Sequence, residues 1–387
     1  MRGAGESVAD RGLARGSRHN SPRERLLRWR DRLLGNPRFQ RAAARFPLTR
    51  PVARRRAQAL FDLSAGFVYS QILYACVRAG LFDLLAEGPL STAEVAQATG
   101  LPEAGALRLL RGAAALRLVQ PAGDDWRLGD RGAVMLGNTA IGAMVSHHER
   151  LYADLADPLA LLGGSADTQL AALWPYAEGG REAMPEAEVA AYSELMAASQ
   201  SLLAEDILDA CGVGDSRRWL DVGGGEGVFL AAALRRAPAL HGTVLDLPQV
   251  AARARDRLVQ CGLGVRADAV GGDMFADAWP EGADTISLVR VLHDHDDAPA
   301  RQLVQRAAAA LEAGGRLVIA EPMAGTPGAE AVGDGYFGFY LLAMGSGRPR
   351  TAEELSAWAL AAGFSRCREL RTAQPMLARV LVADRGA

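Results

Sequence analysis

Short apolar runs alternate with helical patterns from residue 217 to the end of the chain. The helical patterns cover 228–236, 249–260 and 299–313. Such alternation is typical of a parallel sheet that helices cover on both faces, so we predict an α/β domain here. The predicted strands are RWLDVG, GTVLDL, VRADAV, DTISLVRVL and GRLVIAE, and the segments SRCRELRTA and PMLARVLVADR predict a closing strand pair.

The pattern before residue 217 is mostly helical, with apolar helical segments over 57–110 and mixed ones over 140–205. The stretch STAEVAQATGLPEAGALRLLRGAAALRLVQPAGDDWRLGD predicts a helix, a Gly-Leu-Pro turn, a second helix and a two-stranded wing around Pro121–Asp125. A winged helix raises the question of DNA binding. The presumed recognition helix offers only Arg108 and Arg111, so a phosphate-binding surface is missing. The pattern therefore favours a structural or dimerisation role.

The first 56 residues form a distinct leader. Residues 1–20 are predicted to be disordered, because they hold almost nothing to bury. SPRERLLRWRDRLLG then predicts a helix, with Ser21 as N-cap, Pro22 at the first position, Glu24 completing a capping box and Gly35 at the stop. Leucines and Trp29 fall near one side, among arginines. This helix either lies on an anionic membrane surface or packs on its own protein or a partner subunit.

Charge is distributed unevenly along the 387 residues. Sixteen arginines against four acids give residues 1–56 a charge of +12, which leaves −14 for the rest of a chain whose net charge is −2. No run of about 18 uncharged apolar residues indicates a transmembrane helix, and no apolar segment with a cleavage site indicates a secretory signal. The four cysteines are scattered and suggest reduced intracellular thiols. We expect a cytoplasmic protein, with the leader as a candidate peripheral contact to the inner or photosynthetic membrane.

The most distinctive motif is DVGGGEG, residues 221–227, between a predicted strand and a predicted helix. Glycine permits a tight turn and close approach of a ligand to the main chain. A dinucleotide fingerprint needs GxGxxG, but Val228 or Leu230 stands where the third glycine belongs. The spacing that fits is acid-x-Gly-x-Gly-x-Gly, formed by Asp221, Gly223, Gly225 and Gly227. It resembles the first motif of class I S-adenosylmethionine-dependent methyltransferases.

Further acids at strand ends fit the same cofactor. The Asp221 carboxylate is suited to the ammonium of the methionine moiety, and Asp246, followed by Leu247, is suited to both ribose hydroxyls. In the resemblance, Asp273 takes the exocyclic amine of adenine and Met274 packs on its ring. The alternative for Asp246 and Asp273 is that each is a solvated acid at a strand end.

The stretch LVRVLHDHDD, residues 288–297, carries the candidate chemistry. Its histidines and acids raise the question of a metal site, but neighbouring side chains at a strand end point in different directions, so we expect no metal. A single histidine acting as general base is the better hypothesis, because an alcohol must lose its proton as it is methylated. His293 is that candidate, and Asp294 and Glu321 are candidates to hold its tautomer. A core histidine is the structural alternative.

Residues 57–385 resemble the plant-type small-molecule O-methyltransferases, the caffeate, isoflavone and acetylserotonin group. The resemblance implies a helical and winged-helix dimerisation domain, a Rossmann-like catalytic domain and a homodimer. It places the base on His293, the acid of the next strand on Glu321 and a cofactor-contacting methionine on Met196. Three positions depart from the pattern: His295 replaces a tryptophan, a second buttressing acid falls at Pro349, and a lysine near adenine falls at Val289, where Arg290 is the substitute.

The acceptor region is predicted in DGYFGFYLLAMGSG, residues 334–347. The candidate lining residues are Tyr336, Phe337, Phe339, Tyr340, Leu341 and Met344. A plain core helix is the alternative. An apolar lining suits a lipophilic small-molecule acceptor. The leader and the segments FDLSAGFVYSQILYACVRAGLFDLL and HHERLYADLADPLALL resemble the purple-bacterial branch, the hydroxyneurosporene (demethylspheroidene) O-methyltransferases, which methylate the tertiary 1-hydroxyl of an acyclic carotenoid.

On this resemblance we divide the chain into four parts. They are an Arg-rich leader over 1–56, a winged-helix-like dimerisation domain over 57–150, a helical connector with acceptor-site residues over 151–215, and an S-adenosylmethionine-binding catalytic domain over 216–387. Two other functions stay open at this point: O-methylation of a soluble phenol or polyketide, and a non-catalytic dimer that binds the cofactor.

Overall fold

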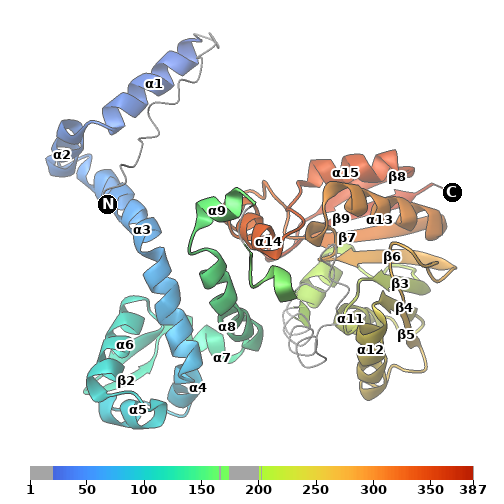
Figure 1. Cartoon of the computed structure of the whole chain (residues 1–387), viewed down its shortest axis with the longest axis horizontal. Coiled ribbons are helices and arrows are strands. Elements are labelled where there is room, and N and C mark those ends of the chain that lie inside the picture. The colour runs from blue at the N-terminus through green and yellow to red at the C-terminus, as the bar shows by residue number, and fades with distance from the viewer. Residues whose placement is uncertain (1–20, 165–166, 174–199, 202, 387) are drawn as a thin grey trace, which may run out of the picture. The chain divides into compact units, whose positions relative to one another are not determined.

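A computed structural model of the chain describes residues 21–164, 167–173, 200–201 and 203–386 (Figure 1). Two predictions fall outside the described residues: disorder over 1–20 and the cofactor contact of Met196. The chain divides into two compact units, Met1–Ile72 and Leu73–Ala387.

The smaller unit consists of helices α1 (Pro22–Leu34), α2 (Pro37–Arg45) and most of α3 (Arg50–Arg78). The predicted start and stop of α1 are confirmed: the Ser21 side chain accepts a hydrogen bond from the Glu24 backbone N–H, and Gly35 ends the helix. The Glu24 side chain accepts from Arg28 at 3.0 Å instead of completing the capping box. Neither α1 nor α2 contains a buried residue.

Helix α3 has the length and composition of a membrane-spanning helix. Its most apolar window has a mean hydropathy of 1.4, and 6% of that window is buried. No span was predicted from the sequence, because the uncharged run between Asp62 and Arg78 is shorter than a span requires. A helix that packs against another protein surface has the same length and composition.

The larger unit begins with the predicted winged-helix pattern. Helices α4 (Leu81–Ala86), α5 (Thr92–Thr99) and α6 (Glu103–Ala115) pack around a core that includes Leu81, Val95 and Leu110. Strands β1 (Val119–Ala122) and β2 (Asp125–Leu128) form the antiparallel wing, and α7 (Asp130–Leu136) follows. Helices α8 (Thr139–Asp154) and α9 (Pro158–Leu162) and the short η2 (Ala171–Leu173) lead towards the sheet.

A seven-stranded sheet in the order β5-β4-β3-β6-β7-β9-β8 forms the centre of the larger unit. The pairs among the first five strands of that order are parallel, and β9 is antiparallel to both β7 and β8, so the predicted parallel sheet and closing strand pair are confirmed. The strands are β3 (Arg218–Val222), β4 (His241–Asp246), β5 (Ala267–Gly271), β6 (Ala283–Val289), β7 (Leu311–Glu321), β8 (Phe364–Leu370) and β9 (Arg379–Arg385).

Apolar side chains alternate between the two faces of this sheet. In β3, Trp219 faces the core shared with helices α11 (Val228–Arg236) and α12 (Pro248–Gln260), whereas Leu220 faces the core shared with α13 (Asp297–Ala310) and α15 (Ala352–Ala361). Helices therefore cover both faces (Figure 1). The predicted helix 299–313 ends earlier, at Ala310, because the buried Leu311 already pairs with β6. The carboxyl ends of β3, β4, β6 and β7 share one edge, where this fold class binds ligands.

Candidate functional site

The glycine motif forms the turn between β3 and α11. Gly223, Gly225 and Gly227 all have left-handed backbone conformations, with φ of 66°, 57° and 74°. A Cβ on Gly223 would lie 2.7 Å from Cγ2 of Val291, and one on Gly224 would lie 2.5 Å from the Asp221 carboxylate. The turn therefore needs glycine both for its conformation and for its close contacts.

Asp221, at the base of this turn, is fully buried, and one of its two carboxylate oxygens accepts a hydrogen bond from a described residue. Its Oδ1 accepts a hydrogen bond from Ser287, whose hydroxyl in turn accepts one from Trp219 Nε1 at 2.8 Å. Its Oδ2 has no hydrogen-bond partner among the described residues. Burial, together with the nearby charge of Asp246, raises the pKa of Asp221 to about 7 despite the Ser287 hydrogen bond. An incoming ammonium would satisfy the free oxygen and restore its charge.

Asp246, at the end of β4, lies against the same turn. Its Oδ2 accepts from the Gly225 backbone N–H and its Oδ1 accepts from the Leu247 N–H, both at 2.8 Å. The carboxylate thereby connects the end of β4 to the glycine turn. The structure brings together Asp221, Gly223, Gly225, Gly227, Asp246 and Leu247, as the sequence predicts.

The remaining cofactor candidates also lie near strand ends. Asp273 follows β5 and accepts from the Phe275 backbone N–H at 2.8 Å, and the half-buried Met274 comes next. Arg290 directly follows β6 and has a left-handed conformation with φ of 57°. Its N–H donates a hydrogen bond to the Ala320 carbonyl. A non-glycine residue in this conformation costs roughly 1–2 kcal/mol, so packing at the end of β6 stabilises it.

His293 lies in η3 (Leu292–Asp294), a short turn of 3₁₀-helix directly after β6 and Arg290, and is 5% exposed. Its Nδ1 makes a close contact with Glu321 Oε2, and its Nε2 lies 3.2 Å from Asp294 Oδ1. The other oxygen of Glu321 accepts from the backbone N–H groups of Val291 and Leu292, at 3.0 and 2.8 Å. Glu321, at the end of β7, therefore fixes the imidazole and the turn that carries it.

Two carboxylates set the basicity of this imidazole. Burial by itself lowers the pKa of His293, but the charges of Asp294 and Glu321 outweigh burial and raise the pKa above its ordinary value. Burial also raises the pKa of Asp294 to about 6, against the opposing charge of His293. When Nδ1–H donates to Glu321, Nε2 carries the lone pair that accepts a proton. This arrangement suits a general base.

His295 points to a different environment from His293. Its ring packs edge-on against Phe275 at 5.0 Å between centroids, and burial, with the neighbouring His293, lowers its pKa to about 4. It is a neutral aromatic core residue at the position where the family has tryptophan. The described residues contain no group of three or more His, Cys, Asp or Glu that could hold a metal ion.

An aromatic cluster adjoins His293. It is formed by Tyr336 and Phe337 of η4 (Ala331–Phe337, a turn of π-helix), Tyr340 of α14 (Gly338–Met344), and His147 and His148 of α8. The Phe337 ring packs edge-on to His293 at 6.0 Å between centroids. Tyr340 pairs with His147 at 3.0 Å and Tyr336 with His148 at 2.7 Å.

The candidate acceptor residues are not all in this cluster. Tyr336, Phe337 and Tyr340 belong to it. Leu341 and Met344 pack beside Tyr340 in a small apolar core, and Phe339 is 37% exposed. Sequence reasoning left His147, His148 and Ser287 out of the site. The adjacent pair His147–His148 was the only signal available for the α8 contribution, and nothing in the sequence connects it to residues almost 200 positions later.

The sheet order, the glycine turn and the strand-end acids define the class I methyltransferase fold. Residues 152–365 match the O-methyltransferase domain and residues 61–145 match the O-methyltransferase dimerisation domain. The chain therefore belongs to the O-methyltransferase family, and its cofactor is S-adenosylmethionine. The predicted family, fold class and enzyme class are confirmed, and the dimerisation domain supports a homodimer.

Curated relatives and a solved structure give the same result. The chain is 43% identical over 355 residues to demethylspheroidene O-methyltransferase of Cereibacter sphaeroides, covering 92% of this chain and 94% of that protein. It is 41% identical over 342 residues to the protein of the same name from Rhodobacter capsulatus, covering 88% and 86%. The crystal structure of the S-adenosylmethionine-dependent methyltransferase SibL superposes with a TM-score of 0.71 at 26% identity, covering 85% of this chain and 99% of that one.

Proposed function

We propose that this enzyme methylates the tertiary 1-hydroxyl of an acyclic carotenoid of the hydroxyneurosporene or demethylspheroidene type. The observation that carries the proposal is the identity of 43% and 41%, over most of the chain, to two demethylspheroidene O-methyltransferases. The aromatic cluster beside His293 supports an acceptor that is largely hydrocarbon.

The residues at the strand ends fit the cofactor. Oδ2 of Asp221, which no described residue pairs with, is suited to its ammonium. Asp246 and Leu247 are suited to the ribose, and Asp273, Met274 and Arg290 to the adenine end. The glycines keep side chains away from that surface. When bound, S-adenosylmethionine supplies an electrophilic methyl group on a sulfonium.

His293 is the proposed general base. A tertiary alcohol is a very weak acid, so its proton leaves as the new O–C bond forms and no free alkoxide accumulates. Nε2 of His293 takes that proton, while Glu321 holds Nδ1–H and so fixes the tautomer. The negative charges of Glu321 and Asp294 stabilise the imidazolium that results.

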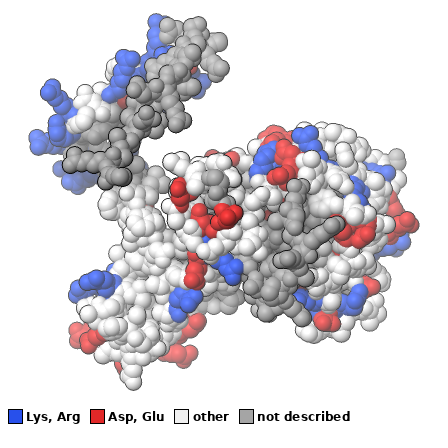
Figure 2. Space-filling model, viewed as in Figure 1, with Lys and Arg blue, Asp and Glu red and all other residues white. Residues whose placement is uncertain are grey.

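We further propose that residues 21–56 bind an anionic membrane, which is where a carotenoid is held. This segment has twelve arginines against Glu24 and Asp31. Apolar side chains lie exposed among them, with Leu26 62% and Trp29 60% exposed. Figure 2 shows arginines gathered over this part of the chain, whereas both signs of charge are interspersed elsewhere. Apolar contact combined with basic charge is the requirement for binding an anionic lipid surface.

A methyl-transfer assay with labelled S-adenosylmethionine tests the proposed substrate. A 1-hydroxycarotenoid in detergent or liposomes is compared with a catechol-type phenol at equal concentration. We expect label in the carotenoid, with a kcat/KM at least 100-fold above that for the phenol. Label in the phenol alone would leave the O-methyltransferase mechanism intact and refute the carotenoid assignment.

Vesicle flotation tests the membrane contact. Replacing Arg23, Arg25 and Arg32 by glutamine removes three charges from the leader, and we expect binding to anionic vesicles to fall at least 10-fold, at about 1 kcal/mol per charge. The control replaces the exposed Arg108, Arg111 and Arg127 of the winged-helix part, which is the same change in net charge. Equal losses for the two triple variants, or equal binding of the wild type to neutral vesicles, would refute a leader-specific contact.

A further inference from the structure

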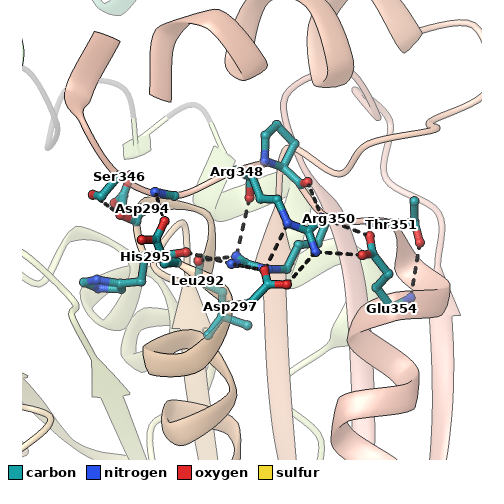
Figure 3. Close-up of polar contacts among 12 residues, drawn as sticks. Leu292, Asp294, His295, Asp297, Ser346, Arg348, Arg350, Thr351 and Glu354 are labelled. Atoms are coloured by element: carbon teal, nitrogen blue, oxygen red, sulfur yellow. Dashed lines mark hydrogen bonds and ion pairs between the residues drawn. The ribbon is translucent and has the colours of Figure 1, made fainter. Parts of the chain in front are cut away.

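The loop Ser346–Arg350 lies against the turn that carries His293 (Figure 3). Ser346 Oγ donates to the Asp294 carbonyl at 2.8 Å, and the Gly347 N–H donates to Asp296 at 3.0 Å. A Cβ on Gly347 would lie 2.1 Å from the His293 carbonyl oxygen, so the two main chains are in direct contact. Pro349, where the family pattern places a second acid, lies in this loop and has no carboxylate to offer.

We propose that Arg350 is a positioning residue that holds the turn carrying His293. Its side chain is 1% exposed. Nη1 donates to the Leu292 carbonyl at 2.6 Å and Nη2 donates to the His295 carbonyl at 2.7 Å. These carbonyls flank the pair His293–Asp294, so one rigid, planar group fixes both ends of the segment that carries the proposed base. The inference rests on the proposed function in that it takes His293 to be the base.

The opposite side of the turn is held by Glu321. Its Oε1 accepts from the N–H groups of Val291 and Leu292, while Arg350 donates to carbonyls of the same turn. The turn is therefore held at its donors by a buried carboxylate and at its acceptors by a buried guanidinium. A rotation of η3 that moved His293 away from Glu321 would break bonds of both kinds.

Arg350 is itself well fixed. Nη2 pairs with Asp297 Oδ1 at 3.0 Å, and its guanidinium lies 4.8 Å from the centre of the Trp358 ring. An opposite charge and an aromatic face are what a buried cation needs to remain charged. Figure 3 shows Arg350 between the turn and Asp297.

Arg348 provides a matched control within the same loop. It also binds Asp297, at 3.0 Å, and it pairs with Glu354 at 2.8 Å. Its side chain is 42% exposed, and no hydrogen bond joins it to η3 among the described residues. Arg348 therefore shares the charge and the acidic partner of Arg350 and lacks its contact with the turn.

The test compares Arg350→Lys, Arg350→Gln and Arg348→Gln in the full-length enzyme, measuring kcat, the KM for S-adenosylmethionine, its Kd and Tm. We expect kcat to fall about 100-fold in Arg350→Gln, the size of effect that a displacement of about 1 Å produces, with Kd for S-adenosylmethionine within threefold of wild type. Arg350→Lys keeps the charge but not the fork, and we expect an intermediate kcat. The acidic limb of its pH profile should move to lower pH. His293 is then no longer held between Asp294 and Glu321, whose charges raise its pKa. Arg348→Gln should retain kcat within threefold.

Two results would overturn the proposal. One is an equal loss of kcat in Arg348→Gln and Arg350→Gln. The other is an Arg350→Lys enzyme with wild-type kcat and pH profile, and this variant decides the question if Arg350→Gln does not fold. His293→Ala, assayed in parallel, separates this inference from the proposed function. If His293→Ala retains turnover, His293 is not the general base and the proposed mechanism is refuted. If His293→Ala is inactive and Arg350→Lys is fully active, only the role of Arg350 is refuted.

Discussion

Two turns leave the same edge of the sheet and are built in opposite ways. The turn after β3, residues 221–227, has three glycines in left-handed conformations. One carboxylate oxygen of Asp221 has no hydrogen-bond partner within the described part of the chain. The turn after β6, residues 290–297, has its left-handed position occupied by Arg290, and distant side chains hold its backbone at both N–H and carbonyl groups. The first turn contains four glycines, whereas side chains from distant parts of the sequence hold the second turn.

The difference matches two different tasks. A surface that receives a ligand along its backbone must be free of side chains, and its unpaired polar atom can be satisfied by that ligand. A general base must already be oriented before the reaction, because reorganisation during the chemical step would raise the barrier. The two turns also touch, since the Gly223 Cα lies directly against Val291. The following predictions separate their contributions.

The largest effect is expected from comparing the two histidines of the second turn. His293→Ala should lower kcat by about 10³- to 10⁴-fold, the upper range for loss of a general base, with Kd for S-adenosylmethionine within threefold. His295→Phe keeps the edge-on packing against Phe275 and should retain kcat within threefold. Single-turnover kinetics and calorimetry check both. Equal loss of turnover and cofactor binding in His293→Ala would show a structural role only.

Glu321→Gln should lower kcat about 100-fold and shift the pH profile. His293 acts when unprotonated, so activity is lost as the pH falls through its raised pKa. Removing the Glu321 charge lowers that pKa and moves the acidic limb to lower pH. Glu312→Gln is the control, because Glu312 lies on the same strand but pairs with Arg218 at 2.7 Å. An acidic limb that stays in place, measured by kcat against pH, would exclude Glu321 as the group that sets it.

Asp221→Asn should weaken S-adenosylmethionine binding about 10-fold at pH 7.5, the lower range for a hydrogen bond to a charged group. In the wild type, affinity should fall as the pH falls below about 7, because the Asp221 carboxyl then holds a proton that the ammonium must displace. The variant should lack this pH dependence. Calorimetry in two buffers of different ionisation enthalpy detects the released proton, and a pH-independent wild type would contradict the assignment.

The smallest effect concerns stability. Gly225→Ala and Gly223→Ala both introduce a side chain at a left-handed position, at about 1–2 kcal/mol each. Only the Gly223 Cβ meets another residue, Val291 at 2.7 Å, and this overpacking should add about 1–3 kcal/mol. Thermal unfolding without cofactor should therefore give a lower Tm for Gly223→Ala. Equal Tm values would mean that the two turns are not packed against each other.

The same contrast decides how much of the site was predictable. The first turn depends on local chemistry. The glycines that its left-handed conformations require can be identified directly in the sequence, and so can the acids near the ends of β3 and β4. The fold followed from the alternation of apolar segments, except at Ala310, where pairing of Leu311 with β6 ends α13 before its helical pattern stops.

The second turn depends on contacts that no local pattern encodes. Glu321 was predictable, since it ends the neighbouring strand. Arg350 was not, because its partners are the main-chain carbonyls of Leu292 and His295. Every residue has a main-chain carbonyl, so the residue types at these positions give no sign of the contact. The pairing of His148 with Tyr336 likewise joins two helices whose juxtaposition arises only in the folded chain.

The paired hydroxyls of the aromatic cluster have a consequence for hydration. Burial lowers the pKa of His147 to about 4 and also lowers the pKa of His148. Burial raises the pKa of Tyr336 to about 12 and also raises the pKa of Tyr340, so both pairs remain uncharged at neutral pH. Each phenol is already occupied by an imidazole nitrogen. For the polyene of the proposed function, a phenol that already has a hydrogen-bond partner holds water less strongly than a free phenol, so part of the cost of dehydrating this surface is met when the chain folds.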